Sequence, residues 1–220
     1  MNSAVDTPSR STRIATSSAR VVLLLLRARA ILVLIVLLVL FSSLAPSFLT
    51  TNNLAILSKH VAISAILAIG MTFVILAGGI DLSVGSIAGL GGMVAGYVLT
   101  QGILLGSSIY YPPAWIAILL TLAVCLLVGV LNGWLVSKAG VAPFIATLGT
   151  LYVARGAALL LSNGKTFPNL AGQTAHGNTG FPSIGQSALF GLPLPVWIML
   201  ALFAVAAFIE IGRASCRERV

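Results

Sequence analysis

Six long apolar runs constrain the fold of this chain more than any other feature of its sequence. They cover residues 30–49, 54–77, 83–100, 114–136, 143–162 and 194–211. An α-helix crosses the hydrocarbon core of a bilayer with about 20 apolar residues, and it satisfies its own backbone hydrogen bonds there. The runs lack the alternation of polar and apolar residues that membrane β-strands show. We therefore predict an all-α, polytopic transmembrane helical bundle with about six spans.

The charged residues support this prediction by their scarcity and by their positions. Only 7% of the 220 residues are charged, whereas soluble domains carry roughly 25%. Most of the positive charges flank the apolar runs: Arg10, Arg13, Arg20, Arg27 and Arg29 before the first, and Arg213, Arg217 and Arg219 after the last. No basic stripe is interleaved with aromatic residues, so we predict no nucleic-acid partner despite the net charge of +8. The predicted partner of most of the surface is the lipid bilayer.

The same charges predict the orientation of the chain. With the N-terminus in the cytoplasm, both arginine groups and Lys138 fall on the inner side, and only Lys59 and Lys165 fall outside. Cytoplasmic loops of membrane proteins carry an excess of Lys and Arg, so we predict this orientation. Residues 163–193, rich in Gly, Pro, Asn and Ser, then form a long outer loop. Such a loop either carries a binding surface or merely connects two spans.

A Gly-Gly pair and an acid lie between the second and third runs. Gly78 and Gly79 suit the C-terminus of a helix. Asp81 is predicted as the N-cap of the third run, where its carboxylate accepts hydrogen bonds from the amides of Ser83 or Val84. The positive end of the helix dipole also favours a negative charge at this place.

Asp81 is also the only acid between Asp6 and Glu210. An ionisable group at membrane depth is a functional candidate by default. Two interpretations stay open for Asp81: a structural cap at a tight turn, and a direct role in substrate binding or coupling.

The third run carries glycines on one helix face. Gly85, Gly89, Gly92 and Gly96 follow an i, i+4, i+7, i+11 spacing. Small residues let helices approach closely in membranes. The predicted role of this face is packing against another helix; lining a narrow pathway is the alternative.

The fifth run carries polar residues where lipid-facing residues would be apolar. Gly140 breaks the chain before it, and Pro143 suits its first turn. Thr147 and Thr150 share a face at i, i+3 and could bind polyol hydroxyls or their own backbone carbonyls. The predicted topology places Asp81 near the inner side and Arg155 in the outer half of its span. We therefore expect Arg155 to reach outward rather than to pair with Asp81.

These segments resemble a known family, the ribose/xylose-type sugar permeases of bacterial ATP-binding-cassette (ABC) importers. The resemblance lies in Gly78–Ser86, in Gly140–Gly149 continued by Arg155-Gly156, in Asn132-Gly133 and in Asn163-Gly164. It extends over roughly residues 30–213. Branched-chain amino-acid permeases are similar in overall type but lack the Gly-Gly-Ile-Asp run.

The resemblance implies a sugar or polyol transport subunit of the bacterial inner membrane, not an enzyme. The implied partners are cytoplasmic ABC ATPase subunits, a periplasmic sugar-binding protein and a second permease copy, the same or different. Gly164-Lys165-Thr166 does not belong to a Gly-rich phosphate-binding loop, because Leu159 stands where the pattern Gly-x-x-x-x-Gly-Lys-Ser/Thr requires its first glycine, so ATP hydrolysis is expected on a separate subunit. The two cysteines, Cys125 and Cys216, have neither metal-site nor disulfide spacing, and we predict no metal and no cofactor.

The resemblance also assigns candidate residues. The translocation or structural motif is Gly78, Gly79, Asp81, Ser83 and Gly85, and the possible pathway is Asn132, Phe144, Thr147, Thr150 and Arg155. Relatives of this type continue from a Gly-Arg pair into a cytoplasmic loop and further spans, whereas residues 214–220 do not fit that pattern. We therefore expect a cytoplasmic basic tail at 1–29, a partial transmembrane permease domain at 30–211 and an aberrant tail at 212–220, in a chain truncated at its C-terminus.

Three alternatives stay open at this point. A secondary transporter would use Asp81 as an ion or proton site and would need no ATPase. A membrane scaffold would not transport at all, and a truncated permease fragment would be inactive. The sequence does not name the sugar.

Overall fold

The chain is described by a computed structural model covering residues 29–167, 170–172 and 176–217. The predicted basic tail before Arg29 and the last three residues lie outside this description. The chain divides into two compact units, one ending at Leu54 and one beginning at Ala55. Each unit is described by itself.

The first unit contains helix α2 (Arg29–Leu44) and the first turn of helix α3 (Thr51–Leu76). Every described side chain of α2 up to Leu44 is exposed, and all but a few are apolar. An all-round apolar helix is typical of a membrane span. The prediction that this span reaches residue 49 is wrong, because the helix ends at Leu44. Pro46 has no amide hydrogen, and it keeps the residue before it out of the helical conformation.

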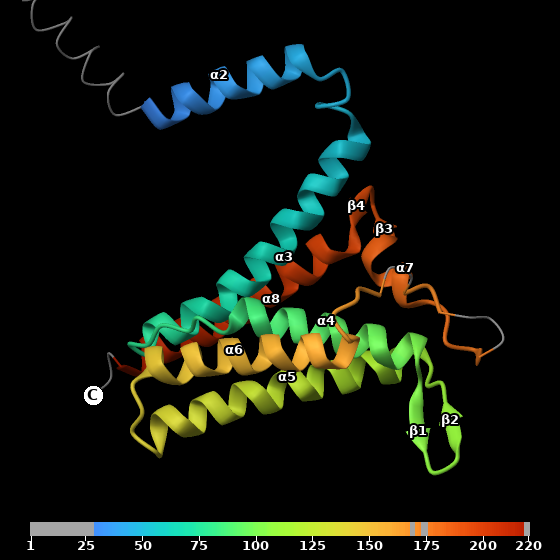
Figure 1. The fold of residues 1–220 in the computed structure, drawn as a ribbon. Coiled ribbons are helices and arrows are strands. Elements are labelled where there is room, and N and C mark those ends of the chain that lie inside the picture. The colour runs from blue at the N-terminus through green and yellow to red at the C-terminus, as the bar shows by residue number, and fades with distance from the viewer. Residues whose placement is uncertain (1–28, 168–169, 173–175, 218–220) are drawn as a thin grey trace, which may run out of the picture. The chain divides into compact units, whose positions relative to one another are not determined.

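The second unit contains the rest of α3, five further helices and two short hairpins (Figure 1). The helices are α4 (Val84–Thr100), α5 (Ala114–Ser137), α6 (Pro143–Ser162), α7 (Phe181–Gln186) and α8 (Leu194–Arg217). The hairpins pair β1 (Ile103–Leu105) with β2 (Ser108–Tyr110), and β3 (Ala188–Leu189) with β4 (Leu192–Pro193). The six predicted spans are thus confirmed as helices; α8 continues past its predicted end at 211.

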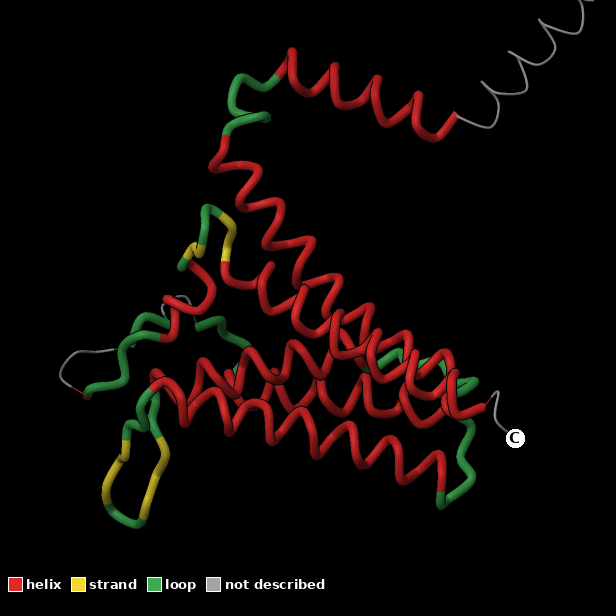
Figure 2. Tube along the Cα trace, turned by 180° about the vertical axis from the view of Figure 1, so that it is seen from behind, coloured by secondary structure: helices red, strands yellow, loops and turns green. Residues whose placement is uncertain are grey.

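Helix α4 packs against both α5 and α6, and these two also pack against each other. Figures 1 and 2 both show the three helices side by side. Their contacts use small side chains: Ala154 and Ala158 of α6 are buried with Leu90 of α4. A second cluster joins Leu99 of α4 to Ala117 of α5. Small residues allow close approach, so α4 forms the centre of this unit.

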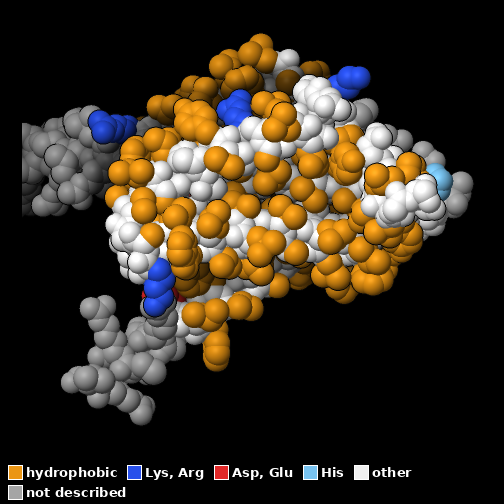
Figure 3. Space-filling model, turned by 60° about the horizontal axis from the view of Figure 1, so that its bottom comes forward, with side chains coloured by type: hydrophobic (Ala, Val, Ile, Leu, Met, Phe, Trp, Pro, Cys, Tyr) orange, Lys and Arg blue, Asp and Glu red, His pale blue; other side chains and the backbone are white. Residues whose placement is uncertain are grey.

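Hydrophobic side chains cover most of the face seen in Figure 3. Helices α3, α5 and α6 are long and apolar enough to cross a membrane, and α2, α4 and Leu194–Glu210 are shorter apolar helices. In water, so much exposed apolar surface would be unfavourable. The chain is a polytopic helical membrane protein, as the apolar runs predict.

The two hairpins lie in connections between predicted spans, and the sequence did not predict them. Ile103 pairs with Tyr110 and Leu105 with Ser108 in an antiparallel ladder. Gly106 takes a positive φ of 64° within the connecting turn, a conformation that glycine adopts readily. Three-residue strands are too short for the alternation of polar and apolar residues to be visible in the sequence.

Candidate functional site

The chain turns sharply between α3 and α4, and two glycines make the turn possible. Gly78 has a positive φ of 81°. Its amide donates to Ile75 O at 2.9 Å, and the Gly79 amide donates to Val74 O at 3.0 Å. This pair of bonds is the Schellman ending of a helix, in which a left-handed glycine satisfies the last carbonyls. The predicted role of the Gly-Gly pair as a helix end is confirmed.

Asp81 binds the start of α4, but not as its N-cap residue. Ser83 occupies the N-cap position, two residues later than predicted. The Ser83 amide donates to Asp81 Oδ1 at 2.7 Å, and the Ser83 hydroxyl donates to the same oxygen. An aspartate side chain that binds the backbone two residues on makes an Asx turn. The predicted hydrogen bond from Ser83 is therefore confirmed, whereas the predicted N-cap position is wrong.

Ser83 continues the hydrogen bonding into the helix bundle. The Asn132 amide group of α5 donates to Ser83 Oγ at 3.0 Å, and the Thr150 hydroxyl of α6 donates to Asn132 Oδ1. Ser83, Asn132 and Thr150 are 0%, 6% and 8% exposed. Each hydroxyl or amide thus donates to the next, and the chain of bonds ends on the Asp81 carboxylate. It ties the first turn of α4 to both neighbouring helices.

Thr147 lies beside this chain of bonds. Its hydroxyl is 2.8 Å from the Pro143 carbonyl of its own helix and 3.3 Å from the Ile80 carbonyl. Thr147 therefore binds backbone carbonyls, one of the two interactions predicted for it, whereas the Thr150 hydroxyl donates to Asn132 instead. Binding of polyol hydroxyls by either residue stays a prediction. We call Asp81, Ser83, Asn132, Thr147 and Thr150 the Asp81 cluster.

A cavity of about 330 Å³ adjoins the Asp81 cluster. Its lining includes Phe73, Gly79, Asp81, Asn132 and Thr147, which come from α3, the turn, α5 and α6. Its size lies within the range of about 300–1,000 Å³ that small-molecule sites occupy. Asp81 makes no ion pair within the described residues, so its charge stays available to this cavity.

Two predicted pathway residues lie apart from the cluster. Phe144 is 52% exposed on the first turn of α6, and it does not line the cavity. Arg155 is exposed in the same helix. In the part of the chain that the structure describes, Arg155 forms no ion pair with Asp81, as expected.

The glycine face of α4 splits into two parts. A Cβ at Gly96 would lie 2.5 Å from the Phe167 ring, so only glycine fits there. A Cβ at Gly85, Gly89 or Gly92 would meet nothing within 4 Å among the described residues. The packing of Gly89 and Gly92 against another helix therefore stays a prediction.

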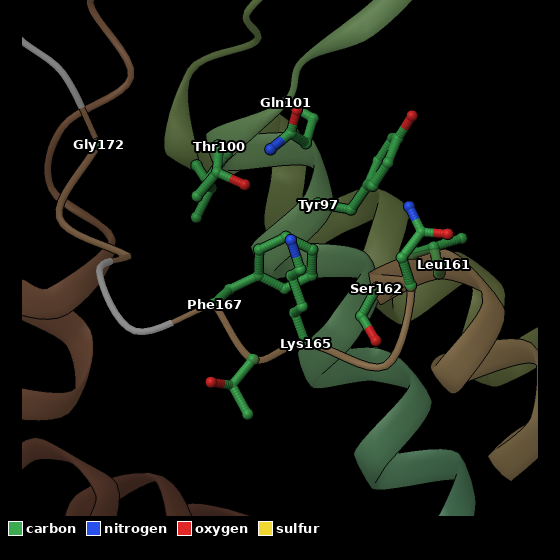
Figure 4. A pocket seen from close by; sticks show the side chains of 11 residues that line it. Tyr97, Thr100, Gln101, Leu161, Ser162, Lys165, Phe167 and Gly172 are labelled. Atoms are coloured by element: carbon green, nitrogen blue, oxygen red, sulfur yellow. The ribbon is translucent and has the colours of Figure 1, made fainter.

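A second hollow lies at the opposite end of α4 (Figure 4). It has a volume of about 640 Å³. We call it the loop-end pocket and define it by Tyr97, Gln101, Ser162, Asn163, Lys165 and Phe167. The sequence singled out the long loop at 163–193 but none of these side chains, because no local motif brings the ends of α4 and α6 together.

Similarity to known proteins identifies the family of this chain. Residues 53–215 match the family model described as the permease component of the branched-chain amino acid transport system. The chain belongs to this permease family. It is a multi-pass membrane protein.

Individual relatives include ribose import permease proteins, and this similarity confirms the predicted resemblance. The permease is 34% identical to a ribose import permease protein of Haemophilus influenzae over 194 residues, 88% of this chain and 56% of the relative. It is 37% identical to that of Escherichia coli K12 over 183 residues, 83% of this chain and 53% of the relative. It is 38% identical to an autoinducer 2 import system permease protein of Klebsiella pneumoniae over 176 residues, which are 78% of this chain and 47% of the relative.

The permease chain spans about half the length of these curated relatives. No solved structure gives a significant match.

Proposed function

We propose that the permease is the membrane-spanning subunit of an ABC importer that carries a sugar or polyol across the bacterial inner membrane. The observation that carries this proposal is the identity with ribose import permeases along most of the chain. The cavity beside Asp81 supports it, because hydroxyl, amide and carboxylate groups near an apolar wall suit a small polyhydroxylated molecule.

The proposed partners follow from the same relationship. Cytoplasmic ABC ATPase subunits would hydrolyse ATP, a periplasmic sugar-binding protein would deliver the substrate, and a second permease copy, the same or different, would complete the membrane part. The N-terminus would lie in the cytoplasm, as the positive charges predict. In this orientation the Asp81 cluster lies near the inner side and the loop-end pocket on the outer side.

The Asp81 cluster has a proposed mechanical role. Its hydrogen bonds join the start of α4 to α5 and α6. The three helices would therefore move as one body when the ATPases close, while the Gly78–Gly79 turn absorbs the change relative to α3. Hinges are typically a few residues at element ends that tolerate large changes of φ and ψ.

A secondary transporter is the alternative that a specific observation favours. An acid at membrane depth is a candidate ion or proton site, and Asp81 lines a cavity and makes no ion pair within the described residues. A transporter of that class would use Asp81 as an ion or proton site and would not depend on ATP.

Uptake by reconstituted vesicles separates the two functions. The full-length permease, its ATPase and its binding protein would be placed in liposomes with labelled ribose and ATP on the ATPase side. We expect uptake that stops without ATP and persists when ionophores collapse all ion gradients. Uptake that survives ATP removal but stops with an ionophore would overturn the ABC proposal.

A further inference from the structure

The loop-end pocket is formed by the ends of α4 and α6 and by the start of the loop that follows α6. Asn163 ends α6 in the left-handed conformation with φ 50°, and Gly164 follows with φ 71°. Their amides donate to Leu160 O at 3.2 Å and to Leu159 O at 2.9 Å. These bonds satisfy the last carbonyls of α6 and fix the direction in which the loop leaves the helix.

The loop is also fastened to α4. The Phe167 ring lies against Gly96, where no side chain would fit. The Asn178 amide group, fully buried, donates to Leu99 O at 2.8 Å near the C-terminus of α4. Asn178 thereby holds the loop on a helix end whose carbonyls have no partner within the helix. The pocket is thus a built feature and not a gap beneath a loose connection.

Several polar side chains of the pocket have hydrogen-bonding capacity to spare. Within the described residues, the side chains of Gln101, Lys165 and Thr166 make no hydrogen bond or ion pair, and all three are exposed. In the view of Figure 4 the Lys165 side chain overlaps the Phe167 ring, and Gln101 and Tyr97 lie above and beside it. No acid lines the pocket. Its chemistry favours a neutral, hydroxyl-rich or anionic ligand and disfavours a cation.

The aromatic rings narrow this choice. Tyr97 and Phe167 both line the hollow, and Tyr97 is 39% exposed. An aromatic face packs against the C–H face of a sugar ring, while amide, hydroxyl and ammonium groups at its edge bind the hydroxyls. A phosphate or carboxylate group would gain nothing from the two rings. The combination is therefore suited to a neutral polyol or monosaccharide.

We propose that the loop-end pocket is a low-affinity binding site for a monosaccharide or polyol, occupied before the substrate reaches the Asp81 end of the bundle. Gln101 and Lys165 bind its hydroxyls, and Tyr97 and Phe167 pack against its ring. This inference rests on the proposed sugar transport and on the orientation that places residues 163–193 outside. Docking of an acidic side chain of the binding protein on Lys165 is the competing use of the pocket.

Paired kinetic measurements on the full-length permease with its ATPase and binding protein test the inference. The variants are Gln101→Ala and Lys165→Gln, and the matched control is Gln186→Ala, exposed on α7 outside the pocket. With saturating ribose-loaded binding protein, we expect sugar uptake to fall about fivefold in each pocket variant, because Gln101→Ala removes a hydrogen-bonding amide and Lys165→Gln replaces a charged donor by a weaker neutral one. The concentration of binding protein that half-saturates the ATPase rate should not change.

Three outcomes would overturn the inference. Pocket variants that transport like Gln186→Ala would show that the pocket takes no substrate. A Lys165→Gln variant that needs more binding protein for half-saturation, with normal maximal uptake, would assign the pocket to docking. Absence of protection by ribose in the thiol-labelling experiment would also overturn the inference. If even the wild-type complex shows no ATP-dependent uptake, the proposed function fails, and the labelling experiment alone decides the pocket.

Thiol labelling tests occupancy without transport. A Thr166→Cys substitution, with Cys125 and Cys216 replaced by serine, places a reactive group at the pocket wall. We expect millimolar ribose to slow modification of this thiol by a membrane-impermeant reagent at least threefold. Mannitol and sodium phosphate, added separately, distinguish a general polyol site and an anion site. No protection by ribose or mannitol would overturn the inference, even if uptake is normal.

Discussion

The two ends of α4 use polar residues in opposite ways. At its N-terminal end, Ser83, Asn132 and Thr150 are buried, and each donates to a neighbouring side chain. At its C-terminal end, Gln101 and Lys165 extend into a hollow and make no side-chain hydrogen bond within the described residues. Both ends are rich in polar groups, yet only one of them satisfies those groups internally.

Hydrogen-bond satisfaction therefore distinguishes structural from ligand-binding polar residues in a membrane bundle. A buried polar group is costly unless it is hydrogen-bonded, so a closed network stabilises one helix arrangement. Polar groups that line a hollow with free capacity can exchange water for a ligand. The Asp81 cluster therefore holds the helices together, and the loop-end pocket is free to bind.

Breaking the closed network should have the largest effect. Asn132→Leu removes both hydrogen bonds that join α5 to α4 and α6. We expect the free energy of unfolding to fall by about 2 kcal/mol, because buried partners at Ser83 and Thr150 each lose a bond. Unfolding in an SDS titration measures it. The control is Thr121→Val on the same helix, whose hydroxyl binds only the Ala117 carbonyl at 2.8 Å. Equal stabilities of the two variants would contradict a structural role for the network.

Asp81 belongs to the closed hydrogen-bond network and also lines the cavity, so its variants can separate a structural role from a role in transport. We expect Asp81→Ala to lower the free energy of unfolding by about 1 kcal/mol, since the turn loses its acceptor. Asp81→Asn keeps an acceptor oxygen and should change stability by less than about 0.5 kcal/mol. If the charge serves transport, Asp81→Asn should nevertheless reduce uptake about tenfold, or about 1.4 kcal/mol of barrier. Normal uptake at normal expression would limit Asp81 to the turn.

The glycines of α4 test whether the two ends are independent. Gly96→Ala forces Phe167 to move and should cost about 1 kcal/mol of stability, with faster proteolysis of the 163–180 loop. Gly92→Ala meets open space within the described chain and should be neutral or slightly stabilising. A strong loss of assembly in Gly92→Ala, with normal stability of the single chain, would show that another helix covers this face. Destabilisation of the Asp81 end by Gly96→Ala would contradict the independence of the two ends of α4.

The smallest effect is expected at His176. Its ring is stacked on Tyr111, with centroids 3.9 Å apart and planes 13° apart. His176→Ala should loosen the loop by about 0.5–1 kcal/mol and leave the Asp81 end unchanged. Amide exchange of residues 176–180 measures this change, and exchange of α5 is the internal reference. Equal changes at both sites would contradict a local contact.

Much of the fold was predictable from sequence because lipid imposes a strong length requirement on helices. The run over 143–162 matches α6 residue for residue, since Gly140 and Pro143 mark its start. The Gly-Gly turn and the bond from Ser83 to Asp81 are local, and local chemistry predicted both. Contacts between distant segments were not predictable. Asn132 and Ser83 are 49 residues apart, and no pattern in the sequence shows that they meet.

The loop-end pocket was missed for the same reason. Phe167 against Gly96 and Asn178 on Leu99 are contacts that only the packed helices create. The strands at 103–105 and 108–110 were also not predicted, because they pair with each other and are too short to leave a periodic signal. From the sequence, Lys165 was predicted only to be one of two positive charges on the outer side.

Hydrogen–deuterium exchange on the full-length permease, with and without ribose, tests the contrast between the two ends most directly. We predict slow exchange at residues 84–88 and 132–136 in both conditions, because the side chains of the Asp81 cluster satisfy one another's hydrogen bonds. We also predict that ribose slows exchange at residues 163–167 and 101–103, where polar side chains have free hydrogen-bonding capacity. Protection by ribose at the Asp81 end, with no change around Lys165, would contradict the account.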